Sequence, residues 1–239
     1  MLNGMATEKL SSSLHFTFYK DSAFGVARLH PLGGPVSGGT LLHVYIVDAR
    51  LLVDLGGSAH GPFCRFAYDE PTLSHHEMLQ RSELVQATLA DCGGMRSCGA
   101  GGRALRCVVP PYAGQLEAGV ADVGVEVTVN GRDFSITGQV YRYFDPTLWR
   151  VHSFAPRGGP LLGNTSVVAT TSHLQSLGDT RCRFGDHLLA SEVDASIQSS
   201  TRLACDSPSH WEQSQATQQV EFQVTLNGQD WMQVGGQRG

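Results

Sequence analysis

The side chains best suited to chemistry in this sequence are six cysteines and ten histidines, the residue types that hold zinc in proteins. The pair His75-His76 lies near Cys92 and Cys98, which makes these four the first candidate metal ligands. Five residues separate the two cysteines, however, which is not a usual zinc spacing, and adjacent histidines on a strand point to opposite faces. We therefore expect no metal and no other cofactor, and interpret the segment as a solvated loop with a local disulfide.

A catalytic site would need a nucleophile, a base and a residue that orients the base, all converging in one pocket. The sequence contains no Gly-x-Ser-x-Gly turn, no phosphate-binding Walker loop and no His-Glu-x-x-His helix. The glycine-rich stretch at 99–102 is the nearest approach to a phosphate cradle, but Arg103 follows it in place of Lys-Ser or Lys-Thr. Since no catalytic role is filled, we expect that the protein is not an enzyme.

The composition excludes further classes of protein. The 28 glycines and 10 prolines in 239 residues are too many for a helical bundle and too few for a disordered tract. Seventeen basic and 22 acidic residues give a net charge of −5 without charged blocks, so we expect no nucleic acid as a partner. No run of about 18 apolar residues is present to insert into a membrane. Residues 1–20 lack the apolar core of a signal peptide, so a secretion signal would lie upstream.

Most of the chain consists of two copies of one module. The segment from Val26 to Pro35 aligns without a gap with the segment from Val151 to Pro160, and both end in Gly-Gly-Pro. Five further blocks follow in the same order in both copies: 38–44 and 163–169, 64–67 and 182–185, 82–88 and 191–196, 106–110 and 204–208, 125–131 and 222–228. Matched blocks in one order indicate an internal repeat, which fixes the organisation of the whole chain.

The repeat frame predicts the domain boundaries. Asn3-Gly4 and the aromatic segment at 15–19 match Asn130-Gly131 and the segment at 140–144, so the chain begins on the end of another copy. We assign 1–22 to the terminal hairpin of a preceding repeat, 23–146 to a first module with a loop insertion at 68–103, and 147–239 to a second module that lacks its last strand. The chain is interpreted as a slice of a longer array.

Alternating hydrophobic residues predict short strands. Val125, Val127 and Val129 alternate with polar residues before Asn130-Gly131, and a similar pattern precedes Asn227-Gly228. Period-two alternation buries one face of a strand, and Asn-Gly is the strongest short-range signal for a hairpin turn. Together with the Pro/Gly turns, these segments predict an all-β fold of antiparallel sandwiches. Within the insertion we expect a short helical turn at 74–81 and a strand at 84–89.

The remaining cysteines fall into the repeat frame. Cys64 and Cys107 occupy the module positions of Cys182 and Cys205. Among the pairings that six cysteines allow, the repeat selects one bond within each module and a local bond between the two cysteines of the insertion. Matched disulfides indicate an oxidising compartment, extracellular or luminal. The alternative is that the four matched cysteines are free and pack as small hydrophobic residues.

The ordered set of motifs resembles the IPT/TIG domain, an immunoglobulin-like module of plexins, scatter-factor-type receptor kinases, fibrocystin-like surface proteins and some transcription factors. The motifs are Gly-Gly-Pro at 33–35, Gly-Gly-Thr at 38–40, Cys-Arg-Phe at 64–66, Cys-x-x-Pro at 107–110 and the Asn-Gly hairpin. The second module has Gly163-Asn164-Thr165 in place of Gly-Gly-Thr, a conservative change for a turn. The resemblance covers nearly the whole chain. It implies tandem immunoglobulin-like β-sandwiches of the IPT/TIG, E-set type, with the cysteine pair bridging neighbouring strands.

Three features are candidates for recognition or modification. Asn164 begins an acceptor sequence for an N-linked glycan on a predicted turn, a pattern that chance also produces. If the chain binds a partner through a loop, we expect the tip of the insertion, with Met95, Arg96 and Arg103, to do so. Trp149, in the short linker, either packs a semi-rigid joint between the modules or belongs to the core of the second module alone.

These observations favour a non-catalytic protein-interaction or spacer segment of a larger cell-surface or secreted multi-IPT/TIG protein. Its expected partners are another protein or neighbouring repeats of the same chain. One alternative is an intracellular IPT-type region that binds DNA or dimerises, for which Arg96, Arg103 and Arg106 are the nearest approach to a basic cluster. The other alternative is an accessory domain of a carbohydrate-active enzyme.

Overall fold

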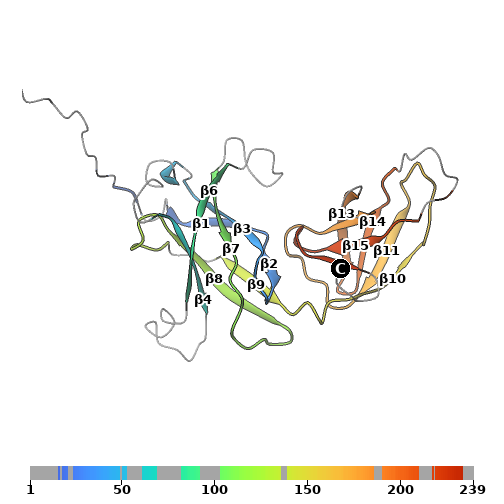
Figure 1. The fold of residues 1–239 in the computed structure, drawn as a ribbon, viewed down its shortest axis with the longest axis horizontal. Helices are drawn as coiled ribbons and strands as arrows, with labels where there is room; N and C mark the ends of the chain where they lie inside the picture. Colours follow the sequence, from blue (N-terminus) through green and yellow to red (C-terminus); the bar gives the residue numbers. More distant parts are fainter. Residues whose placement is uncertain are drawn as a thin grey trace, which may run out of the picture.

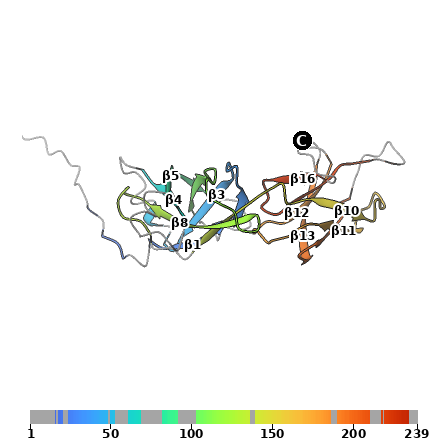
Figure 2. The same cartoon turned by 90° about the horizontal axis from the view of Figure 1, so that it is seen from below.

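The computed structural model describes residues 16, 18–20, 24–48, 50–52, 61–68, 82–91, 103–135, 139–185, 190–209, 217 and 219–233. Within them lie sixteen β-strands, which form two bodies that follow each other along the long axis of the molecule (Figures 1 and 2). Strands β1 to β9 build the first body and β10 to β16 the second. The prediction of an all-β fold of sandwiched sheets is confirmed.

The first module is a sandwich of two sheets. Its strands are β1 (Val26–His30), β2 (Gly33–Pro35), β3 (Leu41–Ile46), β4 (Phe63–Tyr68), β5 (Glu83–Gln86), β6 (Thr88–Asp91), β7 (Arg103–Val108), β8 (Val120–Thr128) and β9 (Val140–Phe144). One sheet has the order β1-β3-β7-β6 and the other the order β2-β9-β8-β4-β5. Val123, Val125 and Val127 of β8 are at most 1% exposed, because alternate residues of a strand share the face that packs on the opposite sheet.

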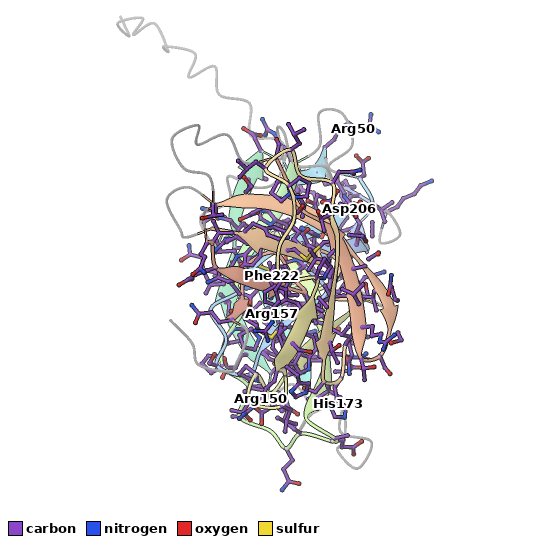
Figure 3. The ribbon with its side chains drawn as sticks, turned by 90° about the vertical axis from the view of Figure 1, so that its right-hand side faces the viewer. Arg50, Arg150, Arg157, His173, Asp206 and Phe222 are labelled. Carbon is purple, nitrogen blue, oxygen red and sulfur yellow. A yellow bond between two sulfur atoms is a disulfide. The ribbon has the colours of Figure 1, made fainter. Side chains whose placement is uncertain are left out.

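The second module repeats this arrangement. Its strands are β10 (Val151–Ala155), β11 (Ser166–Thr171), β12 (Arg181–Phe184), β13 (Ser191–Ser199), β14 (Arg202–Asp206), β15 (Phe222–Thr225) and β16 (Trp231–Gln233). They form one hydrogen-bonded series, β10-β11-β14-β13-β12-β15-β16, which the long strand β13 carries from one layer to the other. Figure 3 shows the layers from the side, with the ring of Phe222 between them. Phe222 is 6% exposed.

In each module one stretch of the chain leaves one sheet and joins the other. In the second module β13 lies beside β12 at Val193 and beside β14 at Ala195. In the first module the same path is divided, since β5 pairs with β4 and β6 pairs with β7, with Ala87 between them. The strand expected at 84–89 is therefore two short strands. The reason is that the chain changes sheets at Ala87, which is 3% exposed.

The apolar core is likewise divided in two. One cluster of buried side chains includes Leu29, Val44, Phe66, Leu105 and Tyr141, all from the first module. A second cluster lies mainly in the second module and includes Val151, Ala169, Leu203 and Val224. Each sandwich therefore has its own hydrophobic core.

The glycines of the repeated motifs allow close contacts between the motifs. A Cβ atom at Gly34 would collide with the side chains of Thr40 and Tyr141. A Cβ atom at Gly38, where φ is +69°, would lie 2.6 Å from the carbonyl carbon of Pro110. The second module repeats both approaches, with Gly159 against Thr165 and Gly163 against Pro208. Gly-Gly-Pro, Gly-x-Thr and Cys-x-x-Pro thus recur together because they touch one another in each sandwich.

Some predictions concern residues outside the described ranges. The helical turn expected at 74–81 lies outside them, as does nearly all of the hairpin expected at 1–22. The prediction that the second module lacks its last strand concerns residues beyond Gln233, which also lie outside. In the part of the chain that is described, no helix is long and apolar enough to cross a membrane.

Candidate functional site

Each module contains one disulfide that crosses its sandwich. Cys64 on β4 is bonded to Cys107 on β7, and Cys182 on β12 to Cys205 on β14, with Cα atoms 6.4 Å apart in both pairs. Strands β4 and β7 belong to different sheets, and β13 separates β12 from β14. The expectation that the pair bridges neighbouring strands is therefore wrong. All four side chains point into the core, where the nearest partner lies on the opposite layer.

The tip of the insertion lies outside the described residues, including Cys92, Cys98, Met95 and Arg96, and so do His75 and His76. Arg103 is described and begins β7 directly opposite Asp91 of β6. Its Nε lies 3.3 Å from Oδ1 of Asp91. Arg103 therefore belongs to the paired base of the insertion, where the two strands hold its ends together.

Asn164 lies on an exposed turn of the second module. Its φ of 63° is in the left-handed region, and Gly39, the matching residue of the first module, has a φ of 90°. The backbone N–H of Asn164 donates a hydrogen bond of 2.8 Å to the backbone carbonyl of Ser207, which fixes the turn. The asparagine side chain is exposed, so the sequence motif lies where a glycan has room.

The joint between the modules has an aromatic centre. Phe144, the last residue of β9, stacks on Trp149, with ring centroids 4.5 Å apart and ring planes 15° apart. Phe144 belongs to a strand of the first module, yet both rings pack in the core of the second. Trp149 therefore has both of the roles considered for it, because the core of the second module itself reaches into the joint.

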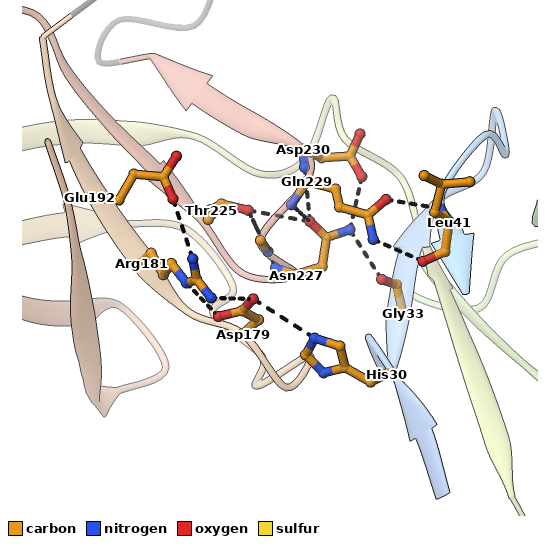
Figure 4. Close-up of polar contacts among 11 residues, drawn as sticks. His30, Gly33, Leu41, Asp179, Arg181, Glu192, Thr225, Asn227, Gln229 and Asp230 are labelled. Carbon is orange, nitrogen blue, oxygen red and sulfur yellow. Dashed lines mark hydrogen bonds and ion pairs between the residues drawn. The ribbon is translucent and has the colours of Figure 1, made fainter. Parts of the chain in front are cut away.

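Hydrogen bonds surround this centre. The Leu32 amide donates to the Leu177 carbonyl at 2.8 Å. The side-chain amide of Gln229 accepts from the Leu41 N–H at 2.8 Å and donates to the Leu41 carbonyl at 2.9 Å (Figure 4). Asn227 Nδ2 donates to the Gly33 carbonyl at 3.1 Å. Four backbone groups of the first module are thus paired with groups of the second.

These contacts come from a turn that both modules possess. In the second module Asn227 accepts hydrogen bonds from the amides of Gln229 and Asp230, and its Nδ2 donates to Asp230 at 2.8 Å. The first module builds the same turn from Asn130 and Asp133. The first copy faces solvent, whereas Asn227 is 2% exposed because the first module covers it.

Charged groups border the joint. His30 Nε2 lies 3.8 Å from Asp179 of the second module, and the same carboxylate accepts from Arg181 at 2.7 and 3.0 Å. Burial lowers the pKa of His30, an effect that Asp179 partly offsets. Burial also acts against the charge of Arg181, but the hydrogen bonds that Arg181 donates to Asp179 and Glu192, together with their negative charge, outweigh it and raise the arginine pKa. Asp179 therefore pairs more closely with Arg181 of its own module than with His30.

A second arginine reaches across the joint from β9. Arg142 Nε donates to Asp122 at 2.6 Å, and its Nη1 donates to Gln175 of the second module at 3.3 Å. Hydrogen bonding to Asp122 raises the pKa of Arg142. The guanidinium thus connects β8 and β9 of the first module to Gln175, in a loop of the second.

Sequence reasoning identified Trp149 but not the polar residues of the joint. The usable signal is a difference between the copies. Gln229 follows Asn-Gly in the second module where Arg132 follows it in the first. The two turns otherwise match, so the change from Arg132 to Gln229 indicates which turn contacts the other module. Among the described residues, no group of three or more His, Cys, Asp or Glu side chains could hold a metal ion.

Comparisons with known proteins give a structural similarity only. No family model matches the sequence, and no curated protein matches it. A structure of the plexin A4 extracellular region, domains 1 to 10, is similar with a TM-score of 0.51 and 15% identity over 88% of this chain. A second, covering domains 1 to 8, has a TM-score of 0.47 at 15% identity over 88% of this chain.

This chain spans only 15% and 17% of the two plexin chains. At such low sequence identity the similarity shows the fold and nothing more. The chain shares the all-β sandwich architecture of that extracellular region.

Proposed function

We propose that this chain is a non-catalytic spacer and protein-interaction segment of a larger cell-surface or secreted protein, built of IPT/TIG domains. Its mechanical role is to hold successive modules at a fixed angle. The observation that carries the proposal is the joint, where the stacked pair of Phe144 and Trp149 is surrounded by hydrogen bonds between the modules.

The energies support a defined angle. An aromatic pair contributes about 0.5–1.5 kcal/mol beyond its buried area, and an intramolecular hydrogen bond about 0.5–1.5 kcal/mol. Interfaces between domains are mobile by default, unless they are large and apolar. Here the linker is short, and Phe144 and Trp149 are 4% and 6% exposed, so bending the joint would expose part of a core. That cost favours one orientation.

The disulfides support a location outside the reducing cytosol. Each module holds its two layers together with a buried bond of the kind that persists in secreted proteins. The similarity to an extracellular region and the resemblance to IPT/TIG modules agree with this location. The partners proposed are neighbouring repeats or another protein.

The test is whether the two modules tumble as one body. Residual dipolar couplings of the described residues should fit a single alignment tensor in the wild-type chain. Two tensors of clearly different magnitude would contradict a spacer of fixed angle. Secretion from mammalian cells, followed by thiol titration in denaturant without reductant, checks the compartment. Cys64, Cys107, Cys182 and Cys205 should then be unreactive, and reactive thiols at these positions would contradict an extracellular location.

A further inference from the structure

One outer face of the first module carries a row of basic side chains. His30 of β1 lies opposite His43 of β3, His43 lies opposite Arg106 of β7, and Arg106 lies opposite Thr88 of β6. Residues directly opposite each other in antiparallel strands point to the same face. The neighbours of these residues along each strand are core residues, so the row faces away from the core. Three adjacent strands thus bring two histidines and an arginine into line, and Thr88 continues the row on the fourth.

A second arginine extends the row along β1. Arg28 is exposed, lies two residues before His30 and is placed over the ring of Tyr45, with 4.1 Å between its guanidinium carbon and the ring centroid. Tyr45 packs with Ala104 of β7 on this same face. The aromatic ring therefore supports the guanidinium at the surface. We call Arg28, His30, His43 and Arg106 the cationic face.

The second module shows that the fold does not require these charges. The same row there runs through Ala155, Val168, Ala204 and Ser196, in the same register. Ser153 takes the place of Arg28. Two copies of one sandwich therefore differ at this face, where the second has small or apolar side chains in place of the basic ones, and the strand pairing is the same in both. The cationic side chains call for an explanation other than stability.

Opposite charge is scarce around this face. In the described part of the chain no ion pair involves Arg28 or Arg106. Asp179 borders the row beside His30, but Arg181 holds that carboxylate more closely. Nδ1 of His43 is buried and has no hydrogen-bond partner among the described residues. Because the pKa values of both histidines are lowered, the positive charge of the face near neutral pH comes from Arg28 and Arg106, and a bound anion would supply the counter-charge that these two arginines lack among the described residues.

We propose that the cationic face binds a sulfated or carboxylated polysaccharide. The face is the flat side of a sheet, on which the exposed donors are the guanidinium groups of Arg28 and Arg106, while His30 is partly buried and His43 is 8% exposed beneath them. An extended polyanion with repeated sulfate groups can pair with such a row through charge-assisted hydrogen bonds. An acidic peptide that adds to a sheet pairs with the backbone of an edge strand, whereas His43 and Arg106 of this face lie on the inner strands β3 and β7.

The histidines make this binding depend on pH. Burial and nearby positive charge lower the pKa of His43, the charges being those of His30 and Arg106. His30 faces Arg28 and Arg181 as well as Asp179, and its pKa is also lowered. A bound anion favours the protonated forms of both rings, so polysaccharide should bind more tightly at pH 5.5 than at pH 7.4.

The test measures binding of the full chain to immobilised heparin, a highly sulfated polysaccharide. Wild-type chain should bind, and binding should weaken steeply between about 0.1 and 1 M salt. Replacing both arginines in R28Q/R106Q should weaken binding by about tenfold or more, since each charged hydrogen bond contributes about 1.5–3 kcal/mol. The matched control is R132Q/R202Q, which removes two exposed arginines elsewhere and should bind within about twofold of wild type.

Two further measurements separate binding of a polysaccharide from misfolding and from binding of an acidic protein. The variant R28K/R106K keeps the charge and should retain most of the binding, which excludes misfolding as the cause of a loss. Absence of wild-type binding, or equal losses in R28Q/R106Q and R132Q/R202Q, would overturn the proposal. Tighter binding to a poly-glutamate peptide than to heparin would assign the face to acidic proteins instead.

The choice of a polysaccharide rests on the proposed extracellular location, because such chains are encountered outside the cell. The two proposals can still fail separately. Heparin binding is measured on purified chain, whatever compartment it comes from. Thiol titration tests the location and does not involve the cationic face.

Discussion

Gln229 and Leu41 are separated by 188 residues in the sequence and are joined by both hydrogen bonds of one side-chain amide. The carboxamide accepts from the Leu41 N–H and donates to the Leu41 carbonyl, so it takes the place of a neighbouring strand at the start of β3. The contact is to backbone, and it therefore does not depend on which side chain stands at position 41. One residue of the second module thus pairs with the first residue of β3, beyond the point where β1 ends.

Replacing Gln229 tests this contact. Q229A removes both hydrogen bonds and should lower the free energy of unfolding by about 1–2 kcal/mol. The loss should come from the contact between the modules, and each module by itself should keep its stability. In calorimetry, the melting temperatures of the two modules should differ more in this variant than in the wild-type chain. R132A changes the matching residue of the exposed turn and should leave the melting profile unchanged. Equal effects of the two variants would show that Gln229 serves its turn and not the joint.

Trp149 is expected to stabilise the second module and the joint together. W149A removes a ring that is 6% exposed and stacked on Phe144, and should cost about 3–5 kcal/mol. Urea unfolding followed by circular dichroism measures the loss. The comparison is W231A, because Trp231 is half-buried and lies over the guanidinium of Arg183 at 3.7 Å. W231A should lower the free energy of unfolding clearly less than W149A does. A larger loss in W231A than in W149A would contradict the role given to Trp149.

The disulfides should contribute similarly to the two modules. Cys64–Cys107 closes a separation of 43 residues and Cys182–Cys205 one of 23 residues. Chain entropy alone then predicts a contribution of about 4 kcal/mol for the first and about 3.4 kcal/mol for the second. Reductant should lower both melting transitions, and the C182A/C205A double variant should lower only that of the second module. A chain whose melting is insensitive to reductant would contradict bonded cysteines.

Stability should fall in mild acid. The pKa values of His30 and His43 lie below the ordinary value of 6.5, chiefly because of burial, so the unfolded chain binds protons more readily. The free energy of unfolding should therefore decrease as the pH falls from about 7 to 5.

Two histidine variants separate this effect from other titrations. H30Q should make the acid loss smaller, whereas H152Q, at an exposed position of β10, should leave it as in wild type. If the loss is the same in all three chains, the titrating groups lie elsewhere.

Local patterns were sufficient to predict the sandwiches. The alternation of Val125, Val127 and Val129 and the Asn-Gly turns at 130 and 227 each depend on neighbours along the chain. The repeat also aligned Cys64 with Cys182, and Cys107 with Cys205, before any geometry was known. These features are readable because strand period and turn conformation are set by short-range sterics.

Contacts between distant segments had to be decided by the tertiary structure. Nothing in the pattern around the cysteines distinguishes a bond across the two layers from one between neighbouring strands. Only the packing of one sheet on the other places β4 over β7. The break at Ala87 likewise follows from the point at which the chain changes sheets.

The joint and the cationic face show the same division. By itself the sequence determined two copies of one sandwich, including the places where the copies differ, such as Gln229 for Arg132 and Ala204 for Arg106. The structure decided which differences matter, because it alone brings Gln229 to Leu41 and aligns His30, His43 and Arg106 across three strands. Periodicity fixes which face of a strand a residue occupies, and strand order and module packing fix what that face meets.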